Sequence, residues 1–207
     1  MFVRATTIDA DPARLDEGIA FVKDNVVPAV DTLPGSLGLS MFVDRDSGAT
    51  TVTTAWETEG ARAEADAVLT PLRAKGARIL GGGTPVTELF ELAVIDRLRP
   101  AQPGFCSRIT RVSIDPGNVD EAIDAYTSST LHDLQLLDGY CSAVLLVDRA
   151  RGLGVVSVTF DTQAHLDASR SRAEDIRRTG LAKAGAEVDE VREAEIVVAG
   201  IRLPQTG

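Results

Sequence analysis

The chain has 207 residues, with 21 Lys and Arg against 31 Asp and Glu, so its formal net charge is −10. A negative charge of this size argues against nucleic acid and against an anionic membrane as partners. No apolar run is long enough to span a membrane, and the first residues lack the basic-then-apolar order of a signal peptide. We therefore expect a cytoplasmic protein.

The first predicted elements are a strand and a helix. Residues 2–8 form the strand, and Asp11 and Pro12 then provide an N-cap and a first helical residue. Apolar residues recur at helical spacing from Ile19 to Val30, and the glycine of "LPGS" suits the positive φ that ends a helix.

A hairpin follows around "DRDSG", then a second helix over residues 59–79 and a β-rich run over residues 86–95. The same order returns from Cys106, with a second helix over residues 163–184. The stretch between the two copies, "RLRPAQPG", is polar and contains proline, which is typical of a linker.

The two copies align without a gap when the chain is shifted by 104 residues. The shift pairs identical residues throughout: Arg4 with Arg108, Asp11 with Asp115, Pro12 with Pro116, Gly35 with Gly139, Asp44 with Asp148, Thr58 with Thr162, Arg73 with Arg177 and Glu91 with Glu195. A register kept over a whole domain length indicates a duplication. The predicted organisation is a first repeat over 1–96, a linker over 97–104 and a second repeat over 105–207.

Each copy has the order β-α-β-β-α-β. This order predicts a ferredoxin-like, four-stranded antiparallel sheet with both helices on one face, so the fold class is α+β. The other face of each sheet is then uncovered, and two copies on one chain can bury these faces against each other.

Two cysteines, Cys106 and Cys141, lack the spacing of metal or redox motifs. The prediction is that both are buried, small apolar residues. We expect no disulfide between them, because they lie on strands that are not neighbours in such a sheet.

The chain resembles a known family in the helix ending "LPG" and in a hairpin strand that ends in "AWET" before a helix. These features are similar to the dimeric α/β-barrel superfamily, within it the antibiotic biosynthesis monooxygenase-like group. The resemblance implies an intramolecular, pseudo-dimeric α/β barrel, either as a monomer or as a homodimer of it. It also implies a pocket between sheet and helices. The superfamily includes cofactor-free oxygenases, haem-degrading enzymes, isomerases and members without known activity.

The family's oxygenase and haem-degrading branches often keep a histidine on the second helix. Here the second repeat has His165, the expected catalytic residue, and the first repeat has Ala61. His165 shares a helix face with Ser169, but a histidine that only makes a hydrogen bond at the helix start is the alternative. Haem binding or degradation is disfavoured. That branch of the family also uses an asparagine on the first strand, where the copies here offer Arg4, Thr6 and Thr7, or Arg108, Thr110 and Arg111.

Arg4 and Arg108 stand at the same position of the first strand in each copy. They are either anchors for a ligand carboxylate or phenolate, or members of structural ion pairs with Glu91 and Glu195.

Trp56 and Phe160 either stack on a planar ligand or plug the core. Tyr126 is either a hydroxyl donor to the ligand or a packing residue. The second repeat has more polar groups on these faces, so the site is expected there.

Two functions agree with these patterns. The first is a cofactor-independent monooxygenase-like protein that binds a small planar or aromatic molecule, with His165 as catalytic residue and no metal or other cofactor. The second is a non-enzymatic small-ligand-binding or stress-response barrel protein.

Overall fold

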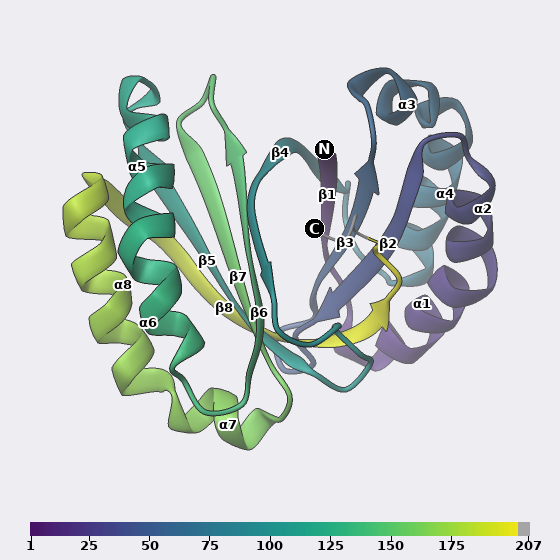
Figure 1. Ribbon diagram of the computed structural model, residues 1–207. Helices are drawn as coiled ribbons and strands as arrows, with labels where there is room; N and C mark the ends of the chain where they lie inside the picture. The colour runs from purple at the N-terminus through teal and green to yellow at the C-terminus, as the bar shows by residue number, and fades with distance from the viewer. Residues whose placement is uncertain (203–207) are drawn as a thin grey trace. The chain divides into compact units, whose positions relative to one another are not determined.

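The computed structural model describes residues 1–202 and contains two compact units (Figure 1). One unit contains Met1–Phe90 and the chain from Ile196, and the other contains Glu91–Glu195. None of the helices in the described range is long and apolar enough to cross a membrane.

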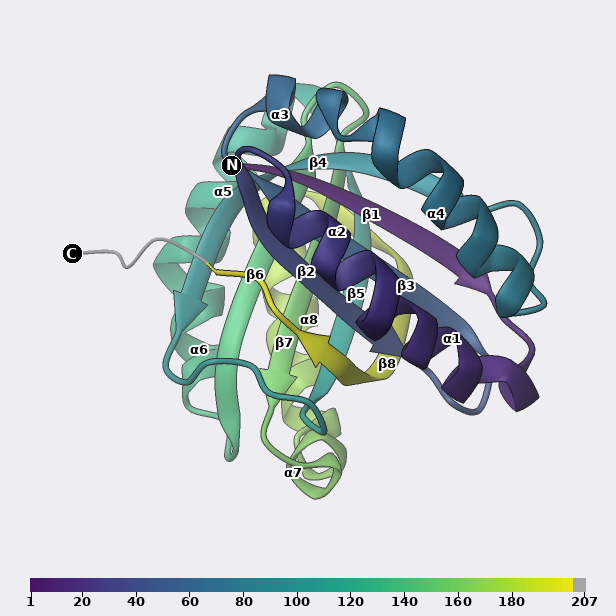
Figure 2. The ribbon, with the colours of Figure 1, turned by 90° about the vertical axis from the view of Figure 1, so that its right-hand side faces the viewer.

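The first unit pairs three antiparallel strands, with β3 between β1 and β2. Its strands are β1 (Phe2–Asp9), β2 (Ser36–Val43), β3 (Ala49–Trp56) and the beginning of β4 (Val86–Arg97). Its helices are α1 (Leu15–Phe21), α2 (Val27–Thr32), α3 (Glu59–Glu64) and α4 (Asp66–Ile79). The helices α1, α2 and α4 lie on the same face of the sheet (Figure 2).

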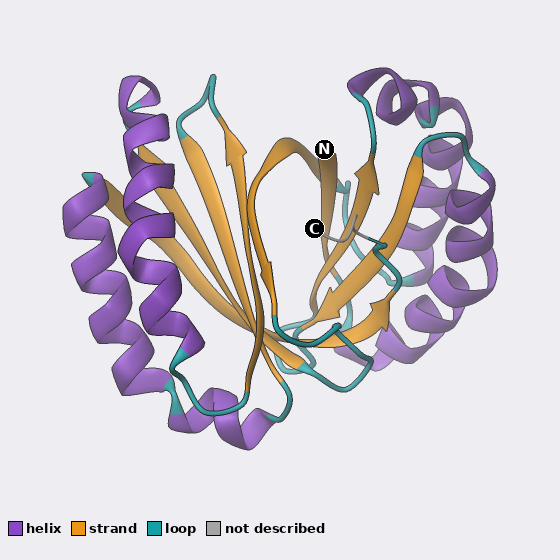
Figure 3. Cartoon of the chain, viewed as in Figure 1, coloured by secondary structure: helices purple, strands orange, loops and turns teal. Residues whose placement is uncertain are grey.

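The second unit repeats this plan, with β7 between β5 and β6 and with β8 beside β5. Its strands are β5 (Cys106–Ile114), β6 (Tyr140–Asp148), β7 (Leu153–Phe160) and most of β8 (Ala186–Ala199). Its helices are α5 (Val119–Ala125), α6 (Leu131–Gln135), α7 (Gln163–Ala168) and α8 (Arg170–Ala184). The helices α5, α6 and α8 cover one face of this sheet (Figure 3).

The strand order confirms the predicted fold class. It runs β4-β1-β3-β2 in the first repeat and β8-β5-β7-β6 in the second, which is the order of a ferredoxin-like sheet. In the complete order, β2 is followed by β8 and β6 by β4, so the eight antiparallel strands form a closed barrel in one chain.

The division into compact units falls inside β4 and β8, whereas the repeats predicted from the sequence register are 1–96 and 105–207. β4 begins in the first unit, and its residues Glu91–Arg97 pair with β6 in the second. β8 pairs with β5 over Ala186–Glu195 and ends in the first unit. Each long strand therefore belongs to both units.

The predicted helix boundaries are confirmed where local chemistry sets them. The Asp11 carboxylate accepts a hydrogen bond from the backbone N–H of Ala13, and Asp115 does the same for Gly117. Gly35 lies shortly after α2 and has a φ of 69°. This angle is in the left-handed region, which glycine adopts without strain.

The second helix of each repeat differs from the prediction, because it consists of two pieces that meet at Ala65 and at Ser169. In the second repeat, the Ser169 hydroxyl and the Arg108 guanidinium both donate to the carbonyl oxygen of Leu166. These side chains therefore bind a carbonyl of the last turn of α7, near the residue where the two helical pieces meet.

Cys106 and Cys141 are both buried and free. Cys106 is paired in register with Phe160 of β7, and β7 separates β5 from β6. The prediction that the two thiols form no disulfide is therefore confirmed.

Candidate functional site: a pocket in the second unit

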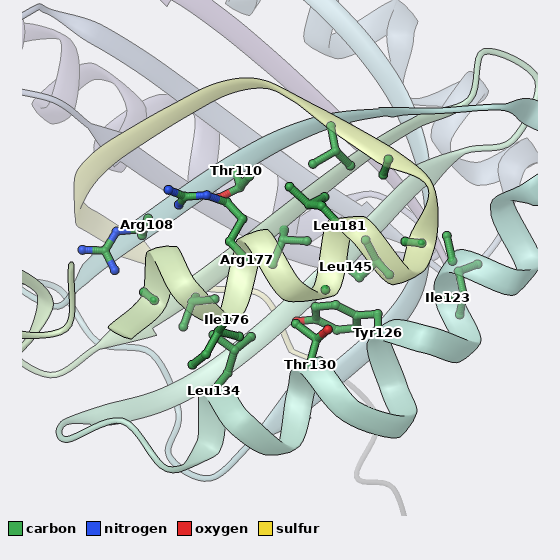
Figure 4. A pocket seen from close by; sticks show the side chains of 18 of the residues that line it. Arg108, Thr110, Ile123, Tyr126, Thr130, Leu134, Leu145, Ile176, Arg177 and Leu181 are labelled. Carbon is green, nitrogen blue, oxygen red and sulfur yellow. The ribbon is translucent and has the colours of Figure 1, made fainter. Parts of the chain in front are cut away.

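A pocket with a volume of about 100 Å³ lies in the second unit, between its sheet and the helices α5, α6 and α8 (Figure 4). Its walls are mainly aliphatic and include Val112, Ile123, Leu134, Leu145, Val147, Val156, Val158, Ile176 and Leu181. Five residues add polar groups to this lining: Arg108, Thr110, Tyr126, Thr130 and Arg177. An apolar cavity with a few polar groups is typical of a small-molecule site.

The pocket is hollow because small residues face it from α8. Ala173 and Ala184 line the pocket, and a shift of 104 residues pairs them with Leu69 and Leu80 of the first repeat. Both leucines are buried, at 2% and 1% exposure. A Cβ added at Gly18 would lie only 2.1 Å from a methyl carbon of Leu80, so this leucine occupies the corresponding space in the first unit.

Phe160 lines the pocket, as one of the two sequence interpretations expected. Its counterpart Trp56 is fully buried in the core of the first unit, where the indole Nε1–H donates to the Thr54 hydroxyl at 3.1 Å. Trp56 therefore packs in a core, as the alternative interpretation had it.

Arg108 is buried and lines the pocket, but its donors are largely engaged. It donates to Glu193 Oε1 from Nε and Nη2, at 3.0 and 2.8 Å, and to the Ser169 hydroxyl at 2.9 Å. The carboxylate partner is thus Glu193 and not the expected Glu195. Alternation of side chains along β8 puts both glutamates on one face. The register of the two strands decides between them, because Arg108 lies opposite Glu193 and Cys106 lies opposite Glu195.

Arg4 also has another partner than the sequence suggested. Its Nη2 donates to Asp66 Oδ2 on α4 at 2.7 Å, and Arg73 donates to the other oxygen of the same carboxylate at 2.6 Å. Glu91 instead pairs with Arg149. The Nε and Nη1 atoms of Arg4 are buried without a hydrogen-bond partner among the described residues.

Tyr126 begins a π-helical segment, Tyr126–Thr130, between α5 and α6. Its ring lines the pocket, and its hydroxyl is buried without a hydrogen-bond partner in the described chain. Burial, and then the nearby charge of Asp96, raise the pKa of Tyr126 well above its usual value. The hydroxyl is therefore protonated at neutral pH and can donate to a ligand.

His165 is not among the residues that line the pocket and lies at the start of α7, where the alternative interpretation placed a hydrogen-bonded histidine. Its Nδ1 shares a 2.6 Å hydrogen bond with Asp161 Oδ1, and 44% of its side chain is exposed. The hydrogen bonds with His165 and with Arg99 lower the pKa of Asp161. Ser169 is buried and contacts the site only through Arg108.

Arg177 and Thr130 line the pocket but were not identified from the sequence. The repeat register had paired Arg177 with Arg73 without singling out either residue. The sequence did contain a difference that could have pointed to Arg177. Asp66, which binds Arg73, corresponds to Arg170 in the second repeat, so the acidic partner of the first repeat is absent from that position.

Several solved structures have the same fold. An anthrone oxidase-like protein is 16% identical with a TM-score of 0.70, covering 99% of this chain and 96% of its own. A candidate monooxygenase from Fusobacterium nucleatum is 14% identical with a TM-score of 0.70, and the match covers 97% of this chain and 93% of that chain. A ferredoxin fold protein from Listeria monocytogenes, related to antibiotic biosynthesis monooxygenases, is 8% identical with a TM-score of 0.53. The match covers 95% of this chain and 93% of that chain.

No protein-family model matches the chain. Two uncharacterized proteins of Mycobacterium tuberculosis strain H37Rv are much more similar in sequence. Rv2557 is 39% identical over 205 residues, which are 99% of this chain and 91% of that protein. Rv2558 is 38% identical over 207 residues, 99% of this chain and 87% of that protein. The chain therefore belongs to the family of Rv2557 and Rv2558, and its fold is that of the dimeric α/β-barrel superfamily, with both repeats of the barrel in one chain.

Proposed function

We propose that this protein binds a small, planar, single-ring molecule in the pocket of the second unit. The observation that carries the proposal is the aliphatic cavity of about 100 Å³ with an unpaired, buried Tyr126 hydroxyl on its wall. Its volume is of the order of the roughly 150 Å³ apolar cavity that binds benzene. A flat ring can contact Phe160 and the aliphatic walls at once, and a buried hydroxyl without a partner favours a ligand with an acceptor.

The test is an NMR titration of the isotope-labelled protein with benzamide, a neutral planar probe. We expect shifts at residues around the pocket in the wild type. Ala173→Leu introduces the side chain of the first repeat and should weaken binding at least about tenfold, while the larger core side chain changes stability by only about 1–3 kcal/mol. Ala182→Leu makes the same change at an exposed position of α8 and should leave binding intact.

His165→Ala should also leave benzamide binding unchanged, because His165 lies outside the pocket. The proposal fails if neither benzamide nor its charged analogue benzoate binds the wild type, or if Ala173→Leu binds the ligand as the wild type does.

A second candidate function is cofactor-independent monooxygenation, which the monooxygenase-like neighbours favour. In such a reaction one oxygen atom enters the substrate and the other leaves as water, with both electrons supplied by the substrate. Hydroquinone would consume one O₂ and give hydroxybenzoquinone and water. Oxygen uptake with this product and without hydrogen peroxide supports the activity, whereas no uptake above the uncatalysed rate leaves ligand binding as the function.

A cytoplasmic location and the oligomeric state remain predictions.

A further inference from the structure

Arg177 is a charged residue of the pocket that has no hydrogen-bond or ion-pair partner among the residues that the structure describes. It lies on α8, is half-buried and lines the pocket. In Figure 4 its side chain extends from α8 toward the side of the pocket where Thr110 is labelled. Within residues 1–202 it makes neither a hydrogen bond nor an ion pair. Charged residues are almost never fully buried without a partner. Arg177 is half-buried beside an apolar cavity, so a ligand in the cavity can supply the partner.

In the first repeat, the arginine at the position of Arg177 has an acidic partner. Arg73, its counterpart, donates to Asp66 at 2.6 Å and to the Thr70 hydroxyl at 2.8 Å. In the second repeat, the position of Asp66 is occupied by Arg170. The replacement of an acid by a base removes the carboxylate that would neutralise Arg177.

Other acids near the pocket do not take over this role. Arg170 pairs with Glu193 at 2.6 Å and with Asp167 at 2.9 Å. Glu193 also accepts from Arg108, which uses most of its remaining donors on Ser169 and on the carbonyl of Leu166. The carboxylates are therefore engaged by other arginines, and Arg177 keeps its positive charge toward the pocket.

The Tyr126 hydroxyl, like Arg177, favours a ligand that offers hydrogen-bond acceptors. The Tyr126 hydroxyl is 8% exposed and has no partner in the described chain. Its raised pKa keeps it a hydrogen-bond donor. Two unmet donors, one of them cationic, are complementary to a ligand that offers acceptor atoms and a negative charge.

We infer that Arg177 is the anion-binding residue of this pocket and that its ligand is a small planar carboxylate, with an aromatic or similarly flat ring held among the aliphatic walls. The inference rests on the proposed function, which it deepens by naming the chemical class of the ligand. Arg177 binds the carboxylate at one end, and Tyr126 donates to an acceptor on the ring or to the carboxylate itself.

The test compares benzoate with benzamide, which have the same shape and differ in charge. Titrations followed by NMR give both dissociation constants for the wild type, Arg177→Gln, Arg177→Lys and Arg178→Gln. Arg178 is the matched control, because it is the next residue on α8, is exposed and pairs with Asp175. A charge-assisted hydrogen bond predicts about tenfold or stronger preference of the wild type for benzoate.

Arg177→Gln should reduce the ratio of the benzamide and benzoate dissociation constants to less than about threefold. Arg177→Lys should keep most of the wild-type ratio, and Arg178→Gln should keep it in full. The inference is overturned if the wild type does not discriminate, or if Arg177→Gln still prefers benzoate about tenfold. If benzamide binds in the pocket but benzoate binds no better, only this inference fails. If neither compound binds, the proposed function fails as well.

Discussion

At the scale of single residues, the two repeats use the same arginines for different purposes. Arg4 and Arg73 share the carboxylate of Asp66 in the first repeat. In the second, Arg108 is neutralised by Glu193 while Arg177 has no carboxylate partner among the described residues. The difference between Asp66 and Arg170 thus accompanies the difference between a paired arginine in the first repeat and a candidate ligand-binding arginine in the second.

The tyrosines provide a residue-scale prediction. The chain has two, Tyr126 and Tyr140, and both have a raised pKa, in each case mainly through burial. Tyr140 also donates a 2.6 Å hydrogen bond to Asp96. In the native protein, the phenolate absorbance should stay absent at about pH 10, the ordinary pKa of tyrosine, whereas the chain unfolded in urea should be about half ionised there.

The sign of the pH dependence follows from these shifts. A raised pKa in the folded state stabilises the fold fully below the ordinary pKa of tyrosine, and this contribution is lost as pH rises toward the folded pKa. Above pH 10 the free energy of unfolding should fall by about 1.4 kcal/mol per pH unit for each tyrosine. Tyr126→Phe should remove one such contribution. An unchanged alkaline slope in this variant would contradict the assignment.

At the scale of elements, α8 shapes the pocket and ends at a defined residue. The helix carries Ala173, Ile176 and Arg177 on its inner face and stops at Gly185, which has a φ of 60° and a ψ of 34°. The N–H of Gly185 bonds back to the carbonyl of Leu181. Because Leu181 and Ala184 both line the pocket, the position of this helix end affects the pocket wall.

Gly185→Ala tests this helix end. A Cβ at this position meets no atom within 4 Å, so the substitution costs only the strain of the left-handed backbone. We expect a loss of about 1–2 kcal/mol in the free energy of unfolding, measured by urea denaturation. Gly83→Ala is the control, since a Cβ there also meets nothing and φ lies outside the left-handed region. Equal stabilities of the two variants would show that Gly185 does not need this conformation.

At the scale of the whole molecule, the two compact units do not coincide with the two halves of the sequence. The first unit includes Ile196 and the residues that follow it, and the second includes Glu91–Arg97 of β4, paired with β6. A cut in the linker at residue 104 therefore deprives each unit of a strand segment.

This arrangement predicts how fragments behave. Fragments 1–104 and 105–207 should not form stable folded monomers when each is produced alone. Produced together, they should copurify as a one-to-one complex that binds benzamide as the intact chain does, because each fragment supplies the segment that the other unit lacks. Native mass spectrometry and the same NMR titration check this. Two separately folded monomers would refute it.

Much of the fold could be predicted from the sequence because its determinants are local or repeated. The 104-residue register, the Asp-Pro helix starts and the glycines at helix ends act within a few residues, and they led to the correct order of strands and helices. The larger set of polar side chains in the second repeat led to the prediction that a ligand binds there, and this stays a prediction.

The site itself required the tertiary structure. Whether Arg108 meets Glu193 or Glu195 depends on the register between β5 and β8, which are far apart in sequence. Whether the His165 side chain turns toward the pocket or toward Asp161, four residues before it, depends on how α7 packs. The sequence alone determined the duplication, the order of elements and the helix ends, since these depend on periodicity and backbone conformation. Only the tertiary structure decided that Ala173 and Ala184 leave a cavity and that Arg177 lines it without a partner, because volume and charge balance are sums over side chains from several elements.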